Sequence, residues 1–254
     1  MRIAFFDIDG TLATGTKVPA SAAEALARMR AKGDLVFICT GRARAYVEAN
    51  FSDYADGFVC NNGRMAFMGE KTLVDAALSG EQVARITAAL DSVDAGYAFF
   101  EVHDAYYGGP EKYRATAEGV LKLGHLPRIE DPAAIHAYNF DIYFDDVAHR
   151  LRATEALGDE CLVNPHGPHP SADVTVKGAD KGDAVRGVAA ALGVTIEDTY
   201  AFGDGINDLT MIVAAGHGIA MGNAVDELKE AAEYVTADID KDGVALAMEH
   251  FGLA

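Results

Sequence analysis

The strongest constraint on the fold comes from short apolar runs that alternate with helical patterns along the first part of the chain. Ile3–Phe6 and Leu35–Cys39 contain only apolar residues, and residues 58–60 form a shorter run of the same kind. Strands without polar alternation are typical of a sheet that is buried on both faces. Between the first two runs, residues 21–32 carry apolar side chains at helical spacing and are followed by Gly33, a common helix stop. This order predicts a parallel sheet with helices on both faces.

The last part of the chain repeats this alternation. Helical patterns cover Lys181–Leu192, 208–215, 224–232 and 244–251, and strand patterns cover 199–202 and 218–221. We therefore expect an α/β fold whose core is a doubly wound, Rossmann-like parallel sheet, made of residues 1–78 and 178–254.

The middle of the chain follows a different pattern. Residues 81–90 and Val147–Leu157 read as helices, and residues 97–102 read as a strand. Residues 139–144 alternate between polar and apolar, which is typical of a strand with one solvated face. Turn-rich stretches at 108–110 and 164–170 interrupt these elements. We expect residues 79–177 to form a smaller α/β domain inserted into the core.

Charge narrows the range of partners. The 254-residue chain has 39 Asp and Glu against 21 Lys and Arg, a formal net charge of −18. Such a field repels nucleic-acid phosphates and anionic lipid headgroups, so we expect no nucleic-acid partner and no membrane partner. A phosphate-bearing small molecule would need a metal ion or a few local cations at its site. We expect a monomer or a weak homo-oligomer.

The cysteines and the apolar runs predict a cytoplasmic location. Cys39, Cys60 and Cys161 form no C-x-x-C pair, and the first two lie in apolar runs, as is typical of buried, reduced thiols. The N-terminal apolar run ends at Asp7, too early for a secretion signal. No apolar stretch approaches the length of a membrane span.

Two carboxylates stand directly after the first apolar run, in the motif Asp7-Ile8-Asp9-Gly10-Thr11. In open α/β sheets, ligands bind at the carboxyl ends of the strands. Like charges at this spacing repel, and a divalent cation removes the conflict because Mg²⁺ prefers carboxylate oxygens. An acidic turn without a ligand is the alternative, and the length of the motif argues against it.

Three further motifs stand at strand ends or helix starts. Cys39-Thr40-Gly41-Arg42 offers a hydroxyl and backbone N–H groups to an anion, although Thr-Gly is equally typical of a helix cap. Lys181-Gly182 places an ammonium at a helix N-terminus, where the helix dipole disfavours it, so that an anionic neighbour or exposure to solvent must compensate. Residues 203–208 (G-D-G-I-N-D) add two carboxylates, the amide of Asn207 and two glycines that permit close approach of the backbone. A plain Gly-Asp turn is the alternative there.

Together the four motifs predict a site for a metal ion and a phosphoryl group at one edge of the sheet. Their order and sequence resemble the haloacid dehalogenase-like hydrolases, most closely the Cof-type phosphatases, which carry a large α/β cap after the third strand. The resemblance spans the whole chain. It implies a Mg²⁺-dependent phosphatase that hydrolyses small soluble phosphate monoesters, such as sugar phosphates or phosphorylated cofactors.

The resemblance also implies catalytic roles. Asp7 would attack phosphorus and form an aspartyl-phosphate, and Asp9 would protonate the leaving alkoxide and then activate water. Asp7, the Asp9 backbone carbonyl and Asp204 would hold Mg²⁺. Asp208 would hold waters of the metal or orient Lys181. The phosphoryl oxygens would be held by Thr40, the Gly41 N–H, Lys181 and Asn207.

One departure from the family pattern is Arg64, since a small residue commonly follows the pair Asn62-Gly63. We expect Arg64, together with Arg42, to face the leaving group and to favour substrates with a second anionic or hydroxyl-rich end. An arginine that joins the surfaces of the two domains is the alternative.

Two polar clusters belong to the inserted domain. Residues 103–107 (H-D-A-Y-Y) either contact the leaving group or pack within the domain. His166 and His169 stand on a Pro/Gly loop without further ligands, and they predict no zinc site.

Two other functions use similar motifs. A phosphomutase or a specialised sugar-phosphate phosphatase would share these residues, and its product distinguishes it: an isomer for a mutase, free phosphate for a phosphatase. A non-catalytic phosphate-binding module, analogous to receiver domains, would also cluster carboxylates on a parallel sheet. Such a module needs neither the general acid expected at Asp9 nor a long insert, and both features argue against it.

Overall fold

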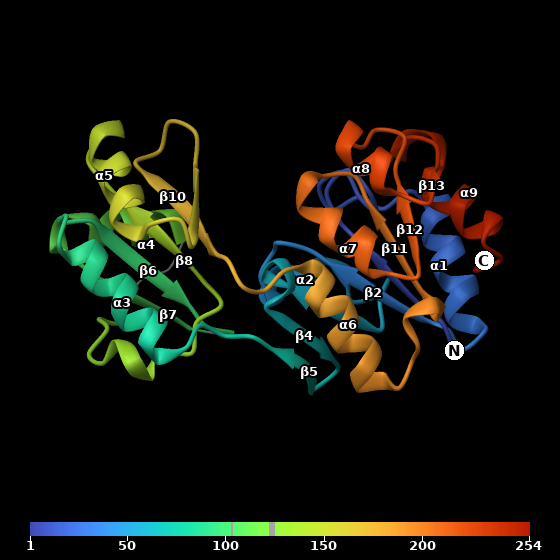
Figure 1. Ribbon diagram of the computed structural model, residues 1–254, viewed down its shortest axis with the longest axis horizontal. Coiled ribbons are helices and arrows are strands. Elements are labelled where there is room, and N and C mark those ends of the chain that lie inside the picture. The colour runs from blue at the N-terminus through green and yellow to red at the C-terminus, as the bar shows by residue number, and fades with distance from the viewer. Residues whose placement is uncertain (103, 122–124) are drawn as a thin grey trace. The chain divides into compact units, whose positions relative to one another are not determined.

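The computed structural model describes residues 1–102, 104–121 and 125–254. The chain divides into two compact units. The core unit comprises Met1–Ala76 and Ala179–Ala254, and the inserted unit comprises Ala77–Gly178; the sequence pattern placed the two crossings at 78/79 and 177/178. Each unit has its own sheet (Figure 1).

The core unit is built on an eight-stranded sheet in the order β13-β12-β11-β1-β2-β3-β4-β5. Its strands are β1 (Ile3–Phe6), β2 (Leu35–Cys39), β3 (Gly57–Cys60), β4 (Met65–Met68), β5 (Lys71–Asp75), β11 (Thr199–Gly203), β12 (His217–Ala220) and β13 (Tyr234–Val235). Neighbours from β13 to β3 run parallel, as the apolar runs predicted. The antiparallel strands β4 and β5 extend the sheet beyond β3, and the sequence pattern missed this hairpin.

Helices cover both sides of the core sheet, which confirms the predicted α/β class. They are α1 (Ala20–Ala31), α2 (Arg44–Phe51), α6 (Lys181–Leu192), α7 (Leu209–Ala214), α8 (Asp226–Ala231) and α9 (Gly243–His250). Helix α1 packs on α9, and α6 packs on α7, with the strands between the two pairs (Figure 1). Because helices cover both faces, all four residues of β1 are fully buried.

Strand β1 lies between β11 and β2, and this position creates the site. Phe6 pairs in register with Phe202 of β11 and with Ile38 of β2. The residues that follow these strands therefore leave the sheet at the same edge. The backbone N–H of Asp7 donates to the carbonyl of Phe202 at 3.0 Å, which extends the ladder to the first carboxylate.

The inserted unit is an antiparallel sheet in the order β7-β6-β8-β10-β9. Its elements are α3 (Gly80–Asp91), β6 (Gly96–Phe100), β7 (Ala105–Gly108), α4 (Arg114–Leu121), β8 (Asn139–Tyr143), α5 (Val147–Leu157), β9 (Cys161–Pro165) and β10 (Ser171–Val176). The alternation in β8 separates two apolar clusters. Phe140 and Ile142 join the cluster formed with α3 and α5, whereas Tyr143 joins the cluster formed with α4.

Residues 103–107 were expected either to contact the leaving group or to pack within the inserted domain, and the structure describes two of their tyrosines. Tyr107 is fully buried within the inserted unit and Tyr106 is half-buried, which is the packing alternative. His103 lies outside the described residues. None of the helices in the described part of the chain has the length and apolar character needed to cross a bilayer.

Candidate active site

Lys181 joins the first and last motifs through a buried ion pair with two carboxylates. It begins α6, whose first turn is capped by Asp180, and only 1% of the residue is exposed. Its Nζ donates to Asp7 Oδ1 and to Asp208 Oδ1, each at 2.6 Å. Burial opposes the charge on the ammonium, but the two carboxylates outweigh it and raise the pKa of Lys181. The unfavourable position at a helix N-terminus is thus compensated by anions rather than by solvent.

Asp208 is fixed by the loop after β11. One of its oxygens, Oδ2, accepts the backbone N–H groups of Asp204 and Gly205, both at 3.0 Å. The other oxygen accepts from Lys181. Asp208 is fully buried, so this loop and the start of α6 are held together by one satisfied carboxylate. An orienting role for Asp208 requires this contact with Lys181, and both expected roles, orienting Lys181 and holding waters of the metal, stay predictions.

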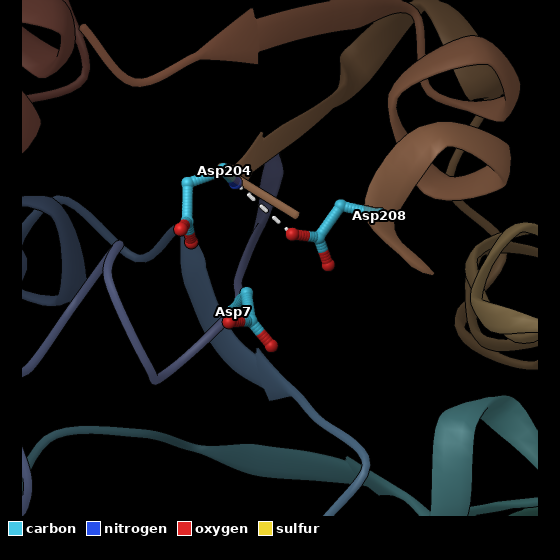
Figure 2. Close-up of side chains that lie close together, drawn as sticks. All are labelled: Asp7, Asp204 and Asp208. Carbon is cyan, nitrogen blue, oxygen red and sulfur yellow. Dashed lines mark hydrogen bonds between the residues drawn. The ribbon is translucent and has the colours of Figure 1, made fainter. Parts of the chain in front are cut away.

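Three carboxylates converge at this edge of the sheet. Oxygen atoms of Asp7, Asp204 and Asp208 lie within 4.8 Å of one another (Figure 2). Thr11 supports the group because its Oγ1 donates to Asp204 Oδ1 at 2.8 Å. Gly10 leaves room for it, since a Cβ at Gly10 would lie 2.3 Å from Asp204 Oδ2. The first and last motifs therefore meet in space, as expected for motifs at the same edge of the sheet, because β1 and β11 are neighbouring strands.

The charge of this cluster fits a divalent cation. Burial raises the pKa of Asp7 to about 6, although Lys181 lowers it, and burial also raises the pKa of Asp204. Asp7 and Asp208 share one ammonium and Asp204 adds a third carboxylate, so excess negative charge is left in a largely desolvated place. Oxygen ligands of this kind suit Mg²⁺, and Asp7 and Asp204 are the side chains that would hold it.

A pocket of about 220 Å³ opens beside the carboxylates. It is lined by Asp7, Asp9, Thr40, Gly41, Arg42, Asn62, Asp204, Gly205 and Asn207. The loop after β2 contributes Thr40, which is 2% exposed and whose Oγ1 accepts the backbone N–H of Arg42 at 3.2 Å. The structure therefore brings three of the four candidate phosphoryl-binding residues, Thr40, Gly41 and Asn207, to the wall of one small polar pocket. The fourth, Lys181, is buried and contacts Asp7.

Asp9 stands apart from the buried carboxylates. Its side chain is 47% exposed and is paired with Arg42, which donates from Nε at 3.2 Å and from Nη2 at 3.3 Å. Arg42 also lies over the ring of Tyr46, 5.0 Å from its centroid. An exposed carboxylate at the pocket wall is accessible to a leaving group, and an exposed ion pair is easily exchanged.

The structure adds to the sequence-based picture at two residues. Arg64 is 5% exposed and does not line the pocket; its Nη1 donates to the carbonyl of Ala76, the last residue of the core unit before the insert. Asn62, for which the sequence predicted no role, lines the pocket instead. The signal for Asn62 is a polar residue close to the end of a buried strand, two residues after β3, whereas Asp7 and Thr40 follow their strands directly.

With this geometry in place, comparison with known proteins identifies the family. A model of the haloacid dehalogenase-like hydrolases matches residues 4–248. The chain belongs to this family. YkrA of Bacillus subtilis is 32% identical over 99% of the chain and 98% of that protein.

Other members of the haloacid dehalogenase-like family with related sequences are phosphatases. The 5-amino-6-(5-phospho-D-ribitylamino)uracil phosphatase YwtE of Bacillus subtilis is 29% identical, with 96% of each chain covered. The solved structure of a sugar phosphatase of subclass IIB matches with a TM-score of 0.73 and 30% identity, covering all of both chains. The chain is thus a hydrolase whose relatives act on phosphoric monoesters.

Proposed function

We propose that this protein is a Mg²⁺-dependent phosphatase for small phosphate monoesters, acting through an aspartyl-phosphate. The observation that carries the proposal is the buried Lys181 shared by Asp7 and Asp208, beside a third carboxylate and a small polar pocket. Phosphoryl transfer asks a protein mainly for positioning and charge neutralisation, and this cluster supplies both. Bound Mg²⁺ would reduce the repulsion between an anionic nucleophile and a dianionic ester.

In this mechanism Asp7 is the nucleophile and Asp9 is the general acid and base. A carboxylate oxygen of Asp7 attacks phosphorus, the ester P–O bond breaks, and the leaving alkoxide takes a proton from Asp9. Asp9, now ionised, takes a proton from water, which attacks phosphorus and breaks the bond to Asp7. Inorganic phosphate and the free alcohol are the products. Asp7 is held by Lys181, whereas Asp9 is at the accessible wall of the pocket, and these environments suit the two roles.

The motif residues would also bind the metal ion and the phosphoryl group. Asp7, the Asp9 carbonyl and Asp204 would hold Mg²⁺. The phosphoryl oxygens would be held by Thr40, the Gly41 N–H, Lys181 and Asn207. Three of these residues, Thr40, Gly41 and Asn207, line the pocket, and Lys181 is hydrogen-bonded to Asp7. The proposed location is the cytoplasm, supported by Cys39 and Cys60, which are buried and form no disulfide in the described part of the chain.

The proposed substrates are phosphorylated alcohols rich in hydroxyl groups. The ribityl phosphate named for YwtE and the sugar phosphate named for the subclass IIB enzyme both belong to this class. Arg42 lines the pocket and is proposed to favour substrates with a second anionic end. The same role stays a prediction for Arg64, whose guanidinium binds the carbonyl of Ala76.

The proposal is tested by phosphate release from p-nitrophenyl phosphate with MgCl₂ and with EDTA. We expect turnover only with Mg²⁺, and free phosphate rather than an isomer from a hexose phosphate. Asp7→Asn should abolish turnover and leave the circular dichroism spectrum unchanged. More than a few per cent of residual activity in this variant would rule out Asp7 as the nucleophile.

A further inference from the structure

The turn after β3 has an unusual backbone that fixes one side chain at the pocket. Asn61 and Asn62 have φ of 52° and 53°, and Gly63 follows with φ of 102°. Consecutive left-handed residues are rare, and asparagine adopts this conformation at lower cost than most residues. Strained backbone of this kind persists where the surrounding structure requires it, often beside a ligand site.

The structure holds this turn against two parts of the active site. The backbone N–H groups of Asn61 and Asn62 donate to the carbonyls of Arg42 and Thr40, at 3.1 and 3.0 Å. On the other side, a Cβ at Gly63 would lie 2.0 Å from the carbonyl oxygen of Asp180, the residue before Lys181. The turn therefore lies tightly between the loop after β2 and the start of α6, which leaves the backbone of Asn62 little freedom to move.

The carboxamide of Asn62 packs closely on Gly41. A Cβ at Gly41 would lie 3.0 Å from Asn62 Oδ1 and 3.2 Å from its Nδ2, so the glycine makes room for the amide. Asn62 Oδ1 is buried and has no hydrogen-bond partner in the described part of the chain. A buried acceptor without a partner is costly, and native structures rarely keep one without a reason.

We propose that Asn62 binds the alcohol part of the substrate by accepting a hydrogen bond from one of its hydroxyl groups. This inference rests on the proposed phosphatase function and specifies its substrate class. A phosphate dianion has no proton to donate to Oδ1, whereas a hydroxyl near the ester has one. Asn62 is thus a specificity-determining residue for polyol phosphates, while the phosphoryl group is held by other residues.

The experiment compares two substrates of equal chain length, ribitol 5-phosphate and n-pentyl phosphate, by phosphate release with Mg²⁺. The variant is Asn62→Gly, because glycine tolerates the positive φ and its lack of a side chain removes the carboxamide. We expect kcat/KM for ribitol 5-phosphate to fall about tenfold, the effect of one lost hydrogen bond, and kcat/KM for n-pentyl phosphate to change less than twofold.

A matched control lies one residue away. Asn61 has the same residue type and backbone region and also a buried, unpartnered Oδ1, but it does not line the pocket. Asn61→Gly should therefore change kcat/KM by less than twofold for both substrates. Asn62→Asp keeps an acceptor and should retain the preference for ribitol 5-phosphate, although its charge lowers both rates.

Three results would overturn the inference. The first is that Asn62→Gly lowers kcat/KM equally for both substrates, and the second is that it changes kcat/KM for neither. The third is that the wild-type protein hydrolyses p-nitrophenyl phosphate but does not prefer ribitol 5-phosphate to n-pentyl phosphate. Failure of the proposed function is a different result, because the wild-type protein would then release no phosphate from p-nitrophenyl phosphate either.

Discussion

Lys181 Nζ lies 2.6 Å from Asp7 Oδ1, and the two side chains are 0% and 10% exposed. The same ammonium is bound to Asp208, and Asp204 adds a third carboxylate nearby. A buried charge is tolerated only when its partners are in place, so each member of this group depends on the others. The arrangement makes the stability of the core unit and the chemistry of the site sensitive to the same residues.

Replacing Lys181 by methionine should therefore affect both stability and activity. Lys181→Met leaves the carboxylates of Asp7 and Asp208 buried without a cation, and we expect the free energy of unfolding in EDTA to fall by about 3–5 kcal/mol. A divalent cation can partly neutralise the carboxylates that have lost the ammonium. MgCl₂ should therefore restore part of the lost free energy of unfolding. Phosphatase activity should remain undetectable in both buffers. Urea denaturation with EDTA and with MgCl₂ measures the effect.

The control for this variant is Lys17→Met, which removes an exposed lysine of the same unit. It should change the free energy of unfolding by less than about 0.5 kcal/mol. Equal stability of wild type and Lys181→Met in EDTA would show that the buried ion pair contributes nothing net.

Gly10 should be required for metal binding because of what a methyl group would touch. Its φ is +91°, and a Cβ would lie 2.3 Å from Asp204 Oδ2, which is itself bound by Thr11. In Gly10→Ala, Asp204 must move. We expect the Mg²⁺ concentration for half-maximal activity to rise at least about tenfold, the loss of roughly 1.4 kcal/mol of binding. A titration of activity with MgCl₂ measures this.

Gly15→Ala separates the contact with Asp204 from the effect of backbone strain. Gly15 has φ of +64°, so alanine is strained there too, but no heavy atom lies within 4 Å of its Cβ. This variant should lose stability and keep its Mg²⁺ requirement. If both variants shift the Mg²⁺ requirement equally, strain in the loop and not displacement of Asp204 is the cause.

Residues that follow predicted strands directly could be placed from the sequence. Asp7, Thr40 and Asp204 follow buried strands of a parallel sheet, and the topology alone brings them to one edge. The partner of Lys181 could not be chosen from the sequence, because an anionic neighbour and solvent both compensate a lysine at a helix start. Arg64 follows the same strand as Asn62, yet its side chain turns inward to the carbonyl of Ala76.

The hairpin of β4 and β5 was missed although a local signal exists. The apolar run of β4 is followed by Gly69, with φ of +56°, and Glu70 before β5 begins. A two-residue loop that begins with a left-handed glycine is typical of a tight hairpin. The other strands predicted a parallel sheet. Parallel strands are joined by crossover connections and not by hairpins, so no hairpin was expected here.

Asp141 gives the inserted unit a pH-dependent stability. It lies on β8, opposite Asp173 of β10, and only 6% of it is exposed. Burial raises the pKa of Asp141 from 3.8 to about 7, and the negative charge of Asp173 contributes to the increase. The folded protein therefore binds a proton at Asp141 in a pH range where the unfolded chain does not.

The sign of the pH effect follows from this difference in proton binding. Between about pH 5 and pH 6.5 the folded state holds more protons at Asp141 than the unfolded state, so the free energy of unfolding should fall as pH rises, by up to about 1.4 kcal/mol per pH unit. Asp141→Asn should remove this contribution, so the difference between wild type and variant in urea denaturation across these pH values isolates it. Asp173→Asn should only reduce the effect, because burial, its larger cause, is unchanged. A wild-type and an Asp141→Asn protein with parallel pH profiles would mean that this carboxyl titrates as it does in the unfolded chain.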